Sequence, residues 1–122
     1  MTRIIVIDSD LTQRRLIIAQ VQEQTGWNVN GAATIRDALT LKLALAQLII
    51  LDWSNLALSE VERDSLRVAT KGVPLVVLAR RDDRARIERF YAENVTIMYR
   101  PFTIGDVVSQ AQELLKGKLK HG

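Results

Sequence analysis

The stretch Gln47-Leu48-Ile49-Ile50-Leu51-Asp52 contains an unbroken apolar run that ends in a carboxylate. Because apolar and polar side chains do not alternate along it, the pattern predicts a strand buried on both faces, as in a parallel sheet. Two further runs have the same character, Arg3-Ile4-Ile5-Val6-Ile7-Asp8 before it and Val73-Pro74-Leu75-Val76-Val77-Leu78-Ala79 after it. Weaker strand patterns lie at 27–32 and 95–99, so we expect five strands.

Helical patterns fill the intervals between these strands. The expected helices are 11–24 with Gly26 as C-cap, 35–46 with Thr34 as N-cap, 59–70 with a capping box of Ser59 and Glu62, about 82–93 with Asp82 or Asp83 as N-cap, and 103–119. The apolar side chains expected to face inward include Leu16, Ile17 and Val21 in the first helix and Leu39, Leu43 and Ala46 in the second. This alternation predicts one α/β domain over residues 1–119 with a tail at 120–122, built as a parallel sheet with helices on both faces.

The composition narrows the classes of function. The 122 residues carry 17 Lys+Arg and 14 Asp+Glu, a formal net charge of +3. There is no cysteine and the one histidine is His121, which excludes thiolate chemistry, Cys-based metal sites and a Ser/His/Asp triad. Aromatic residues make up only 5% and do not interleave with basic ones, so direct nucleic-acid binding is not expected. With no apolar run near the roughly 20 residues that cross a membrane and no recognisable signal peptide, we expect a cytoplasmic protein.

Charged residues follow the expected strands where each one ends. Asp8 and Asp10 come after the first strand, Asp52 ends the third, and Arg100 follows the fifth. The carboxyl ends of the strands form the ligand site in open α/β sheets, and carboxylates meeting there repel each other unless a cation or a basic side chain joins them. Mg²⁺ suits a site of oxygen ligands, and Arg100 or the pair Arg80-Arg81 could supply a basic partner. The simpler alternative is that these acids cap the next helix, as we expect of Asp10.

In this order and spacing, the segments resemble the receiver domain of two-component response regulators over nearly the whole chain. The residues that carry the resemblance are Ile5-Val6-Ile7-Asp8-Ser9-Asp10, Leu48-Ile49-Ile50-Leu51-Asp52, the strand at 73–79, and Tyr99-Arg100-Pro101-Phe102. The resemblance implies a five-stranded parallel sheet of order 2-1-3-4-5 flanked by five helices. It also implies that Asp52 accepts a phosphoryl group from a histidine kinase or a small phosphodonor, with Mg²⁺ held by Asp8, Asp52 and the backbone carbonyl of Ser54.

Several positions depart from the pattern of that family. Ser9 stands where the family has a second acid, which removes the carboxylate that normally contacts the metal. The other departures are Ala79 for a phosphate-binding Ser or Thr, Arg100 for Lys, Ile97 for the switch aromatic, and a loop at 53–58 without proline or glycine. Losing one hydrogen-bond donor of this kind costs about 3 kcal/mol of transition-state stabilisation. We therefore expect a degenerate pseudo-receiver, with Mg²⁺ weakly bound or absent; the alternative is a weak but working phospho-acceptor at Asp52.

The resemblance also implies a surface for partners. In receiver domains the fourth helix, the fifth strand and the last helix bind partners, and here that surface includes Arg84, Arg86 and Tyr99. The implied partner is a histidine kinase, another signalling protein or a fused output domain, and a homodimer is a further option. The alternative is a solvated helix face with ion pairs such as Asp82 with Arg86. The bond between Arg100 and Pro101 is expected to be cis, as is usual in the family.

A different class of protein competes for the same residues. Asp8-Ser9-Asp10-Leu11-Thr12 also fits the Asp-x-Asp-x-Thr pattern of haloacid-dehalogenase-like phosphatases, in which the first Asp is the nucleophile and the second a general acid. That interpretation leaves Asp52 without a role, and the chain is short for that fold. No glycine-rich turn follows the first strand, so nucleotide binding is not expected either. We therefore expect a binding module and not an enzyme.

Overall fold

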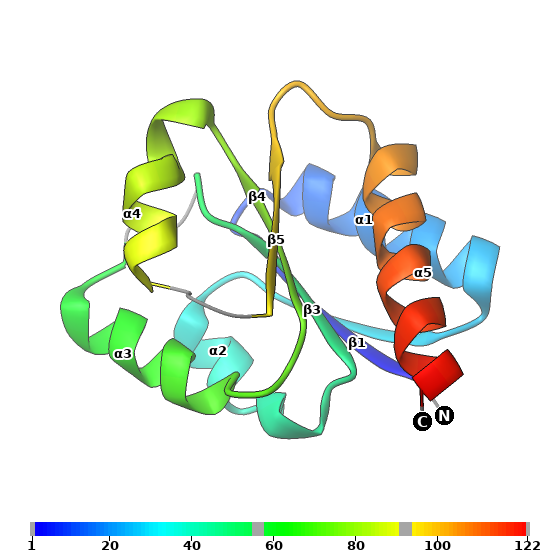
Figure 1. Ribbon diagram of the computed structural model, residues 1–122, viewed down its shortest axis with the longest axis horizontal. Helices are drawn as coiled ribbons and strands as arrows, with labels where there is room; N and C mark the ends of the chain where they lie inside the picture. The colour runs from blue at the N-terminus through cyan, green and yellow to red at the C-terminus, as the bar shows by residue number, and fades with distance from the viewer. Residues whose placement is uncertain (1, 55–57, 91–93, 122) are drawn as a thin grey trace.

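Five parallel strands form the centre of the computed structural model, which describes residues 2–54, 58–90 and 94–121. The strands are β1 (Arg3–Ile7), β2 (Asn28–Ala32), β3 (Leu48–Asp52), β4 (Leu75–Ala79) and β5 (Val95–Tyr99). The α-helices are α1 (Leu11–Thr25), α2 (Ile35–Leu39), α3 (Glu60–Ala69), α4 (Arg84–Phe90) and α5 (Ile104–His121). The strands lie in the order β2-β1-β3-β4-β5 (Figure 1), which confirms the expected architecture and strand order.

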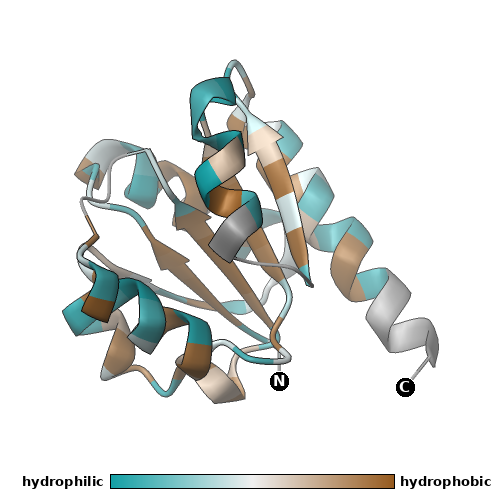
Figure 2. Ribbon diagram, turned by 60° about the vertical axis from the view of Figure 1, so that its left-hand side comes forward, coloured by the Kyte–Doolittle hydropathy of each residue, from teal (hydrophilic) through white to brown (hydrophobic). Residues whose placement is uncertain are grey.

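Helices cover both faces of the sheet, so the central strands β1, β3 and β4 are apolar along nearly their whole length (Figure 2). Along β1, the side chains of Ile5 and Ile7 join one buried cluster with residues of α2, α3 and α4. Those of Ile4 and Val6 join a second cluster with residues of α1 and α5. This alternation follows from the two-residue period of a strand, and it gives the domain one apolar core on each face of the sheet.

The helix starts agree with the capping residues expected from the sequence. Asp10 accepts a hydrogen bond from the Gln13 N–H at 3.0 Å, and Thr34 caps α2 in the same way. Ser59 and Glu62 form the expected capping box at the start of α3. Gly26 closes α1 in the left-handed conformation, which glycine adopts without steric cost. These local signals therefore fix where the chain enters and leaves the sheet.

The expected helix at 35–46 is wrong in its second half. Helix α2 ends at Leu39, and a separate 3-10 turn, η1, follows at Leu43–Leu45. Lys42 between them has φ of 53°, a left-handed conformation that interrupts a helix. Leu43 and Ala46 are buried as expected, but Leu39 is 40% exposed. The prediction failed because the apolar period continues past the residue at which the backbone turns back toward β3.

One other expectation of burial needs correction. Leu16 is 50% exposed, because Ile17 and Val21 form the face of α1 that meets the sheet. Strand β5 is half-exposed along its whole length, since it lies at the edge of the sheet and pairs only with β4. In the part of the chain that the structure describes, no helix is both long and apolar enough to span a bilayer.

The fourth helix begins at Arg84, directly after Asp83, one of the two residues expected to precede it as a cap. A short 3-10 helix, η2 (Arg81–Asp83), precedes α4. Asp83 accepts a hydrogen bond from the Arg80 N–H at 3.0 Å, so of the two candidate caps it is Asp83 that binds the backbone here. The expected end of this helix, Glu93, lies outside the described residues, as does Gly122 of the expected tail.

Candidate functional site

Asp8 and Asp52 lie side by side at the carboxyl edge of the sheet. Strands β1 and β3 pair in parallel, with Ile7 opposite Leu51, so the residues that follow them emerge together. Asp8 is fully buried and Asp52 is 1% exposed. Two neighbouring buried carboxylates are unstable unless hydrogen-bond donors or positive charge compensate them. The pair predicted from the sequence is therefore brought together.

Arg100 supplies the positive charge. Its Nη2 lies 2.6 Å from Asp52 Oδ2, and its Nη1 donates to Ser54 Oγ at 3.1 Å. The Arg100 N–H donates to the Ala79 carbonyl, which holds its backbone beside the end of β4. The bond between Arg100 and Pro101 is cis, as expected. The guanidinium also stacks 5.0 Å from the centre of the Phe102 ring, a favourable cation–π distance. The alternative partners Arg80 and Arg81 are exposed.

Gln13 and Arg100 together hold the carboxylates of Asp8 and Asp52, and we call this pair the clamp. The sequence did not predict the part played by Gln13. Its Nε2 donates to both Asp8 Oδ2 and Asp52 Oδ2, and its Oε1 accepts from Arg100 Nη2 at 3.1 Å. One amide thus joins both carboxylates and the guanidinium, because its nitrogen donates to the carboxylate oxygens and its oxygen accepts from the guanidinium. The sequence offered only a general signal, because Asp10 as N-cap places Gln13 in the first turn of α1, close after the end of β1.

Burial sets the acidity of Asp8. Loss of solvent raises the pKa of the Asp8 carboxyl above its ordinary value of 3.8, and the nearby Asp52 charge acts in the same direction. The hydrogen bonds from Gln13 and from the Asp10 N–H, the latter at 2.9 Å, lower this pKa in part. Asp8 is thus held mainly by donors from its own strand–helix turn, whereas Asp52 also has the charge of Arg100.

The arrangement also bears on the expected Mg²⁺ site. The carboxylate oxygens of Asp8 and Asp52 that face each other both accept from the Gln13 amide, so an N–H donor stands where a cation would need oxygen ligands. Ser9 is exposed and brings no carboxylate. Within the described ranges, no group of three or more His, Cys, Asp or Glu residues is placed to hold a metal. The donor set in this arrangement does not fit Mg²⁺.

Ser54 connects the site to the start of α4. Its hydroxyl accepts from Arg100 and lies 3.5 Å from Asp83 Oδ2, the outer limit for a hydrogen bond. Asp83 is 6% exposed and also accepts from the Arg80 N–H and from Arg86 Nη2 at 3.4 Å. The sequence predicted Asp83 only as a helix cap, whereas here it links two loops at the edge of the sheet.

The remaining predicted positions are distributed as follows. Ala79 is fully buried within the apolar core and offers no hydrogen-bond donor. Tyr99 is half-buried and packs against the same core. Arg84 and Arg86 are exposed, and they pair with Glu88 at 2.9 Å and with Asp83. The ion pair suggested between Asp82 and Arg86 is thus replaced by one with Asp83. Residues 55–57 of the predicted loop lie outside the described residues.

Comparison with known proteins places the fold. No family model matches the sequence, and no curated protein does. A receiver domain protein from Methanospirillum hungatei superposes with a TM-score of 0.75 at 20% identity, over 100% of this chain and 99% of that one. The fold is that of response regulator receiver domains. A two-component transcriptional regulator from Clostridium phytofermentans gives a TM-score of 0.80 at 13% identity, covering 99% of this chain and 98% of that chain.

A third solved structure belongs to a longer protein. A redox sensor of the streptococci, from a family that evolved from two-component response regulators, gives a TM-score of 0.78 at 15% identity. The match covers 97% of this chain but only 52% of that protein, so this chain spans about half of its length. At identities this low, the likeness establishes the fold of the receiver domain.

Proposed function

We propose that this chain is a phosphorylation-independent, receiver-like signalling domain that acts by binding a protein partner and not as an enzyme. The observation that carries the proposal is the clamp on Asp52: Arg100 lies 2.6 Å from its Oδ2, and the Gln13 amide donates to the same oxygen. A carboxylate that accepts two such hydrogen bonds while buried is a poor nucleophile, because one of its lone pairs must be freed before it can attack phosphorus.

The chemistry of phosphoryl transfer supports the same conclusion. Catalysis of this reaction depends almost entirely on placing positive charge and donors around the transferring group. Here the positive charge of Arg100 already neutralises Asp52 in the resting protein, and position 79 is an alanine without a donor. Gln13 stands between the two carboxylates that a metal would need. In our proposal Mg²⁺ has no role, and the arginine has taken its electrostatic place.

One observation favours the alternative, a weak but functional phospho-acceptor at Asp52. The Arg100 side chain is 31% exposed, so it can swing toward solvent and open the site. The Arg100 guanidinium, released from Asp52, Gln13 and Ser54, would then be able to donate to phosphoryl oxygens above Asp52. This alternative requires Mg²⁺ to enter after Gln13 has left the carboxylates.

The test is titration with Mg²⁺ followed by beryllofluoride, which mimics a phosphoryl group on an aspartate. Trp53 is buried directly after Asp52, and Trp27→Phe makes it the one tryptophan of the chain, so its fluorescence reports on the site. We expect no saturable change in tryptophan fluorescence and no heat of binding when the same titration is followed by calorimetry. Circular dichroism should show that the fold is intact. A saturable response that disappears in Asp52→Asn would overturn the proposal and establish the alternative.

The partner is expected to be another protein of a signalling pathway: a histidine kinase, another regulator or a fused output domain. Because the streptococcal sensor is about twice as long as this chain, a receiver-like unit joined to a further segment has a structural precedent. We also propose that the chain acts in the cytoplasm, because receiver domains bind their two-component partners in that compartment. Pull-down with the Asp52→Asn variant alongside the unaltered chain tests the claim that partner binding does not depend on phosphorylation.

A further inference from the structure

Four of the six exposed large apolar side chains among the described residues belong to the segment from α2 to α3, and the other two lie on α1. The four are Leu39, Leu45, Val61 and Val68. On α3, Val61 and Val68 are 75% and 73% exposed and lie seven residues apart, so they share one helical face. Helices α2 and α3 are not part of the surface formed by α4, β5 and α5, which the resemblance implied for partners.

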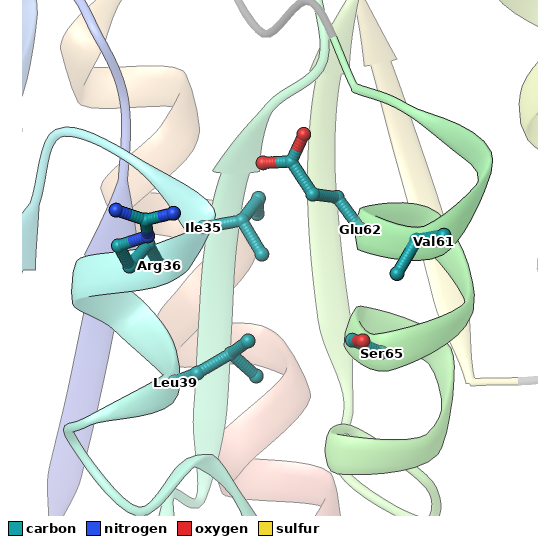
Figure 3. Close-up of a pocket in the computed structure, with 6 residues that line it drawn as sticks. All are labelled: Ile35, Arg36, Leu39, Val61, Glu62 and Ser65. Carbon is teal, nitrogen blue, oxygen red and sulfur yellow. The ribbon is translucent and has the colours of Figure 1, made fainter.

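A groove of about 470 Å³ separates the two helices (Figure 3). Its floor is apolar, and Ile35 and Leu39 of α2 face across it toward α3. Its two rims carry opposite charges, because Arg36 projects from α2 and Glu62 from α3. Within the described residues Arg36 takes part in no ion pair, so its charge is available to an external carboxylate.

We propose that this groove is a dimer interface, and that its occupant is α3 of a second copy of the chain. A two-fold axis across the groove places α2 of one copy opposite α3 of the other, and the same contact then occurs twice. Arg36 of each copy would face Glu62 of its partner, and Leu39 would face Val61. A surface with one basic rim, one acidic rim and an apolar floor is complementary to itself when rotated in this way.

The expected association is weak. The face of α2 and α3 is short, because the helices have five and ten residues, and interfaces below about 1,200 Å² are transient. We therefore expect a concentration-dependent dimer with a dissociation constant on the order of 10–100 µM. The proposal does not rest on phosphorylation of Asp52, since the residues that line the groove include none of those that contact Asp52.

The test is sedimentation equilibrium from roughly 1 µM to 1 mM, a range chosen to bracket that constant. Val61→Lys is expected to abolish the dimer, because it sets a charge against Leu39 and close to the partner's Arg36. Leu11→Lys is the matched control, since Leu11 is also exposed but lies on α1, and it should leave the dimer intact. A monomer at every concentration, or a dimer that survives Val61→Lys, overturns the proposal and assigns the groove to another partner or to none.

The charge pair is tested separately. Glu62→Gln keeps a side chain that can form the capping box with Ser59 but removes the charge, and Arg36→Gln removes the opposite charge. Because each pair occurs twice in the dimer, each variant is expected to weaken association roughly fivefold to tenfold. The double variant should be no weaker than either single one. Additive losses would show that Arg36 and Glu62 do not meet across the interface.

Discussion

Replacing Arg100 with methionine tests how much the fold depends on the clamp. Arg100→Met keeps an apolar side chain of similar length but removes the guanidinium, which lies 2.6 Å from Asp52 and over the Phe102 ring. Asp52 is then left as a buried carboxylate with Gln13 as a remaining donor and with the Asp8 carboxylate beside it. The fold must tolerate an uncompensated charge or admit water to the site.

The magnitude follows from the exposure of the pair. Removing one partner of a fully buried ion pair typically costs about 3–5 kcal/mol. Asp52 is buried, but the Arg100 side chain is 31% exposed, so solvent already screens part of the interaction. We therefore expect Arg100→Met to lower the free energy of unfolding by about 2–3 kcal/mol at neutral pH. At a urea m-value of about 1.5 kcal/mol/M, the midpoint would fall by about 1.3–2 M.

The decisive measurement is a double-mutant cycle by urea denaturation. Asp52→Asn removes the charge that Arg100 compensates, so the double variant should recover about 1–2 kcal/mol relative to Arg100→Met alone. If the two changes were independent, their losses of stability would add, and the double variant would be less stable than Arg100→Met. A gain in stability is therefore expected only if the two residues interact. If the double variant is less stable than Arg100→Met, Asp52 and Arg100 are not coupled and the clamp does not hold the site together.

Three further predictions concern the neighbours of Arg100. Gln13→Leu should lower stability by about 1–3 kcal/mol, since it removes a donor shared by two buried carboxylates, whereas Gln22→Leu on the exposed side of the same helix should have little effect in the same denaturation assay. The raised pKa of Asp8 means that folding favours the protonated carboxyl. The contribution of Asp8 to the free energy of unfolding is therefore fully present below pH 3.8 and is lost as the pH rises through the folded-state pKa. The stability of the unaltered chain relative to Asp8→Asn should therefore fall with rising pH in parallel denaturation series, and a rise would contradict the burial argument. Finally, Ala79→Ser alone should remain silent to beryllofluoride, whereas Ala79→Ser with Arg100→Lys and Gln13→Ala, which also removes the amide from between the two carboxylates, should respond in the tryptophan assay; a response from Ala79→Ser alone would mean that the missing hydroxyl, and not the clamp, blocks the site.

Much of the fold could be predicted because its signals are local. A continuous apolar run such as Leu48–Asp52 is compatible with few environments other than the centre of a covered parallel sheet. Caps such as Asp10 and Ser59 fix helix starts within one turn of the chain. The failures occurred where periodicity alone was the guide: Leu39 continues an apolar pattern although the backbone turns away after it, and the pattern of β5 does not show that it lies at an edge.

The site was predictable in part for a similar reason. Asp8 and Arg100 directly follow β1 and β5, and Asp52 is the last residue of β3, so parallel pairing alone brings all three to one edge of the sheet. Gln13 and Asp83 lie on helical turns, and their roles depend on how far a side chain reaches across from one element to another. No spacing in the sequence distinguishes the glutamine that bridges two carboxylates from another polar residue in a first helical turn.

The clamp also shows how side chains of this chain compensate two buried aspartates. Asp8 and Asp52 would repel each other and lose solvation if no donor or positive charge compensated them. Arg100 supplies a full positive charge, and Gln13 joins both carboxylates with donors of matching sign. Ser54 then ties the guanidinium toward Asp83 at the start of α4, so the loops after β3, β4 and β5 are held in one polar network. In the proposed function, this network keeps the carboxyl edge of the sheet in a single state, as a constitutive binding module requires.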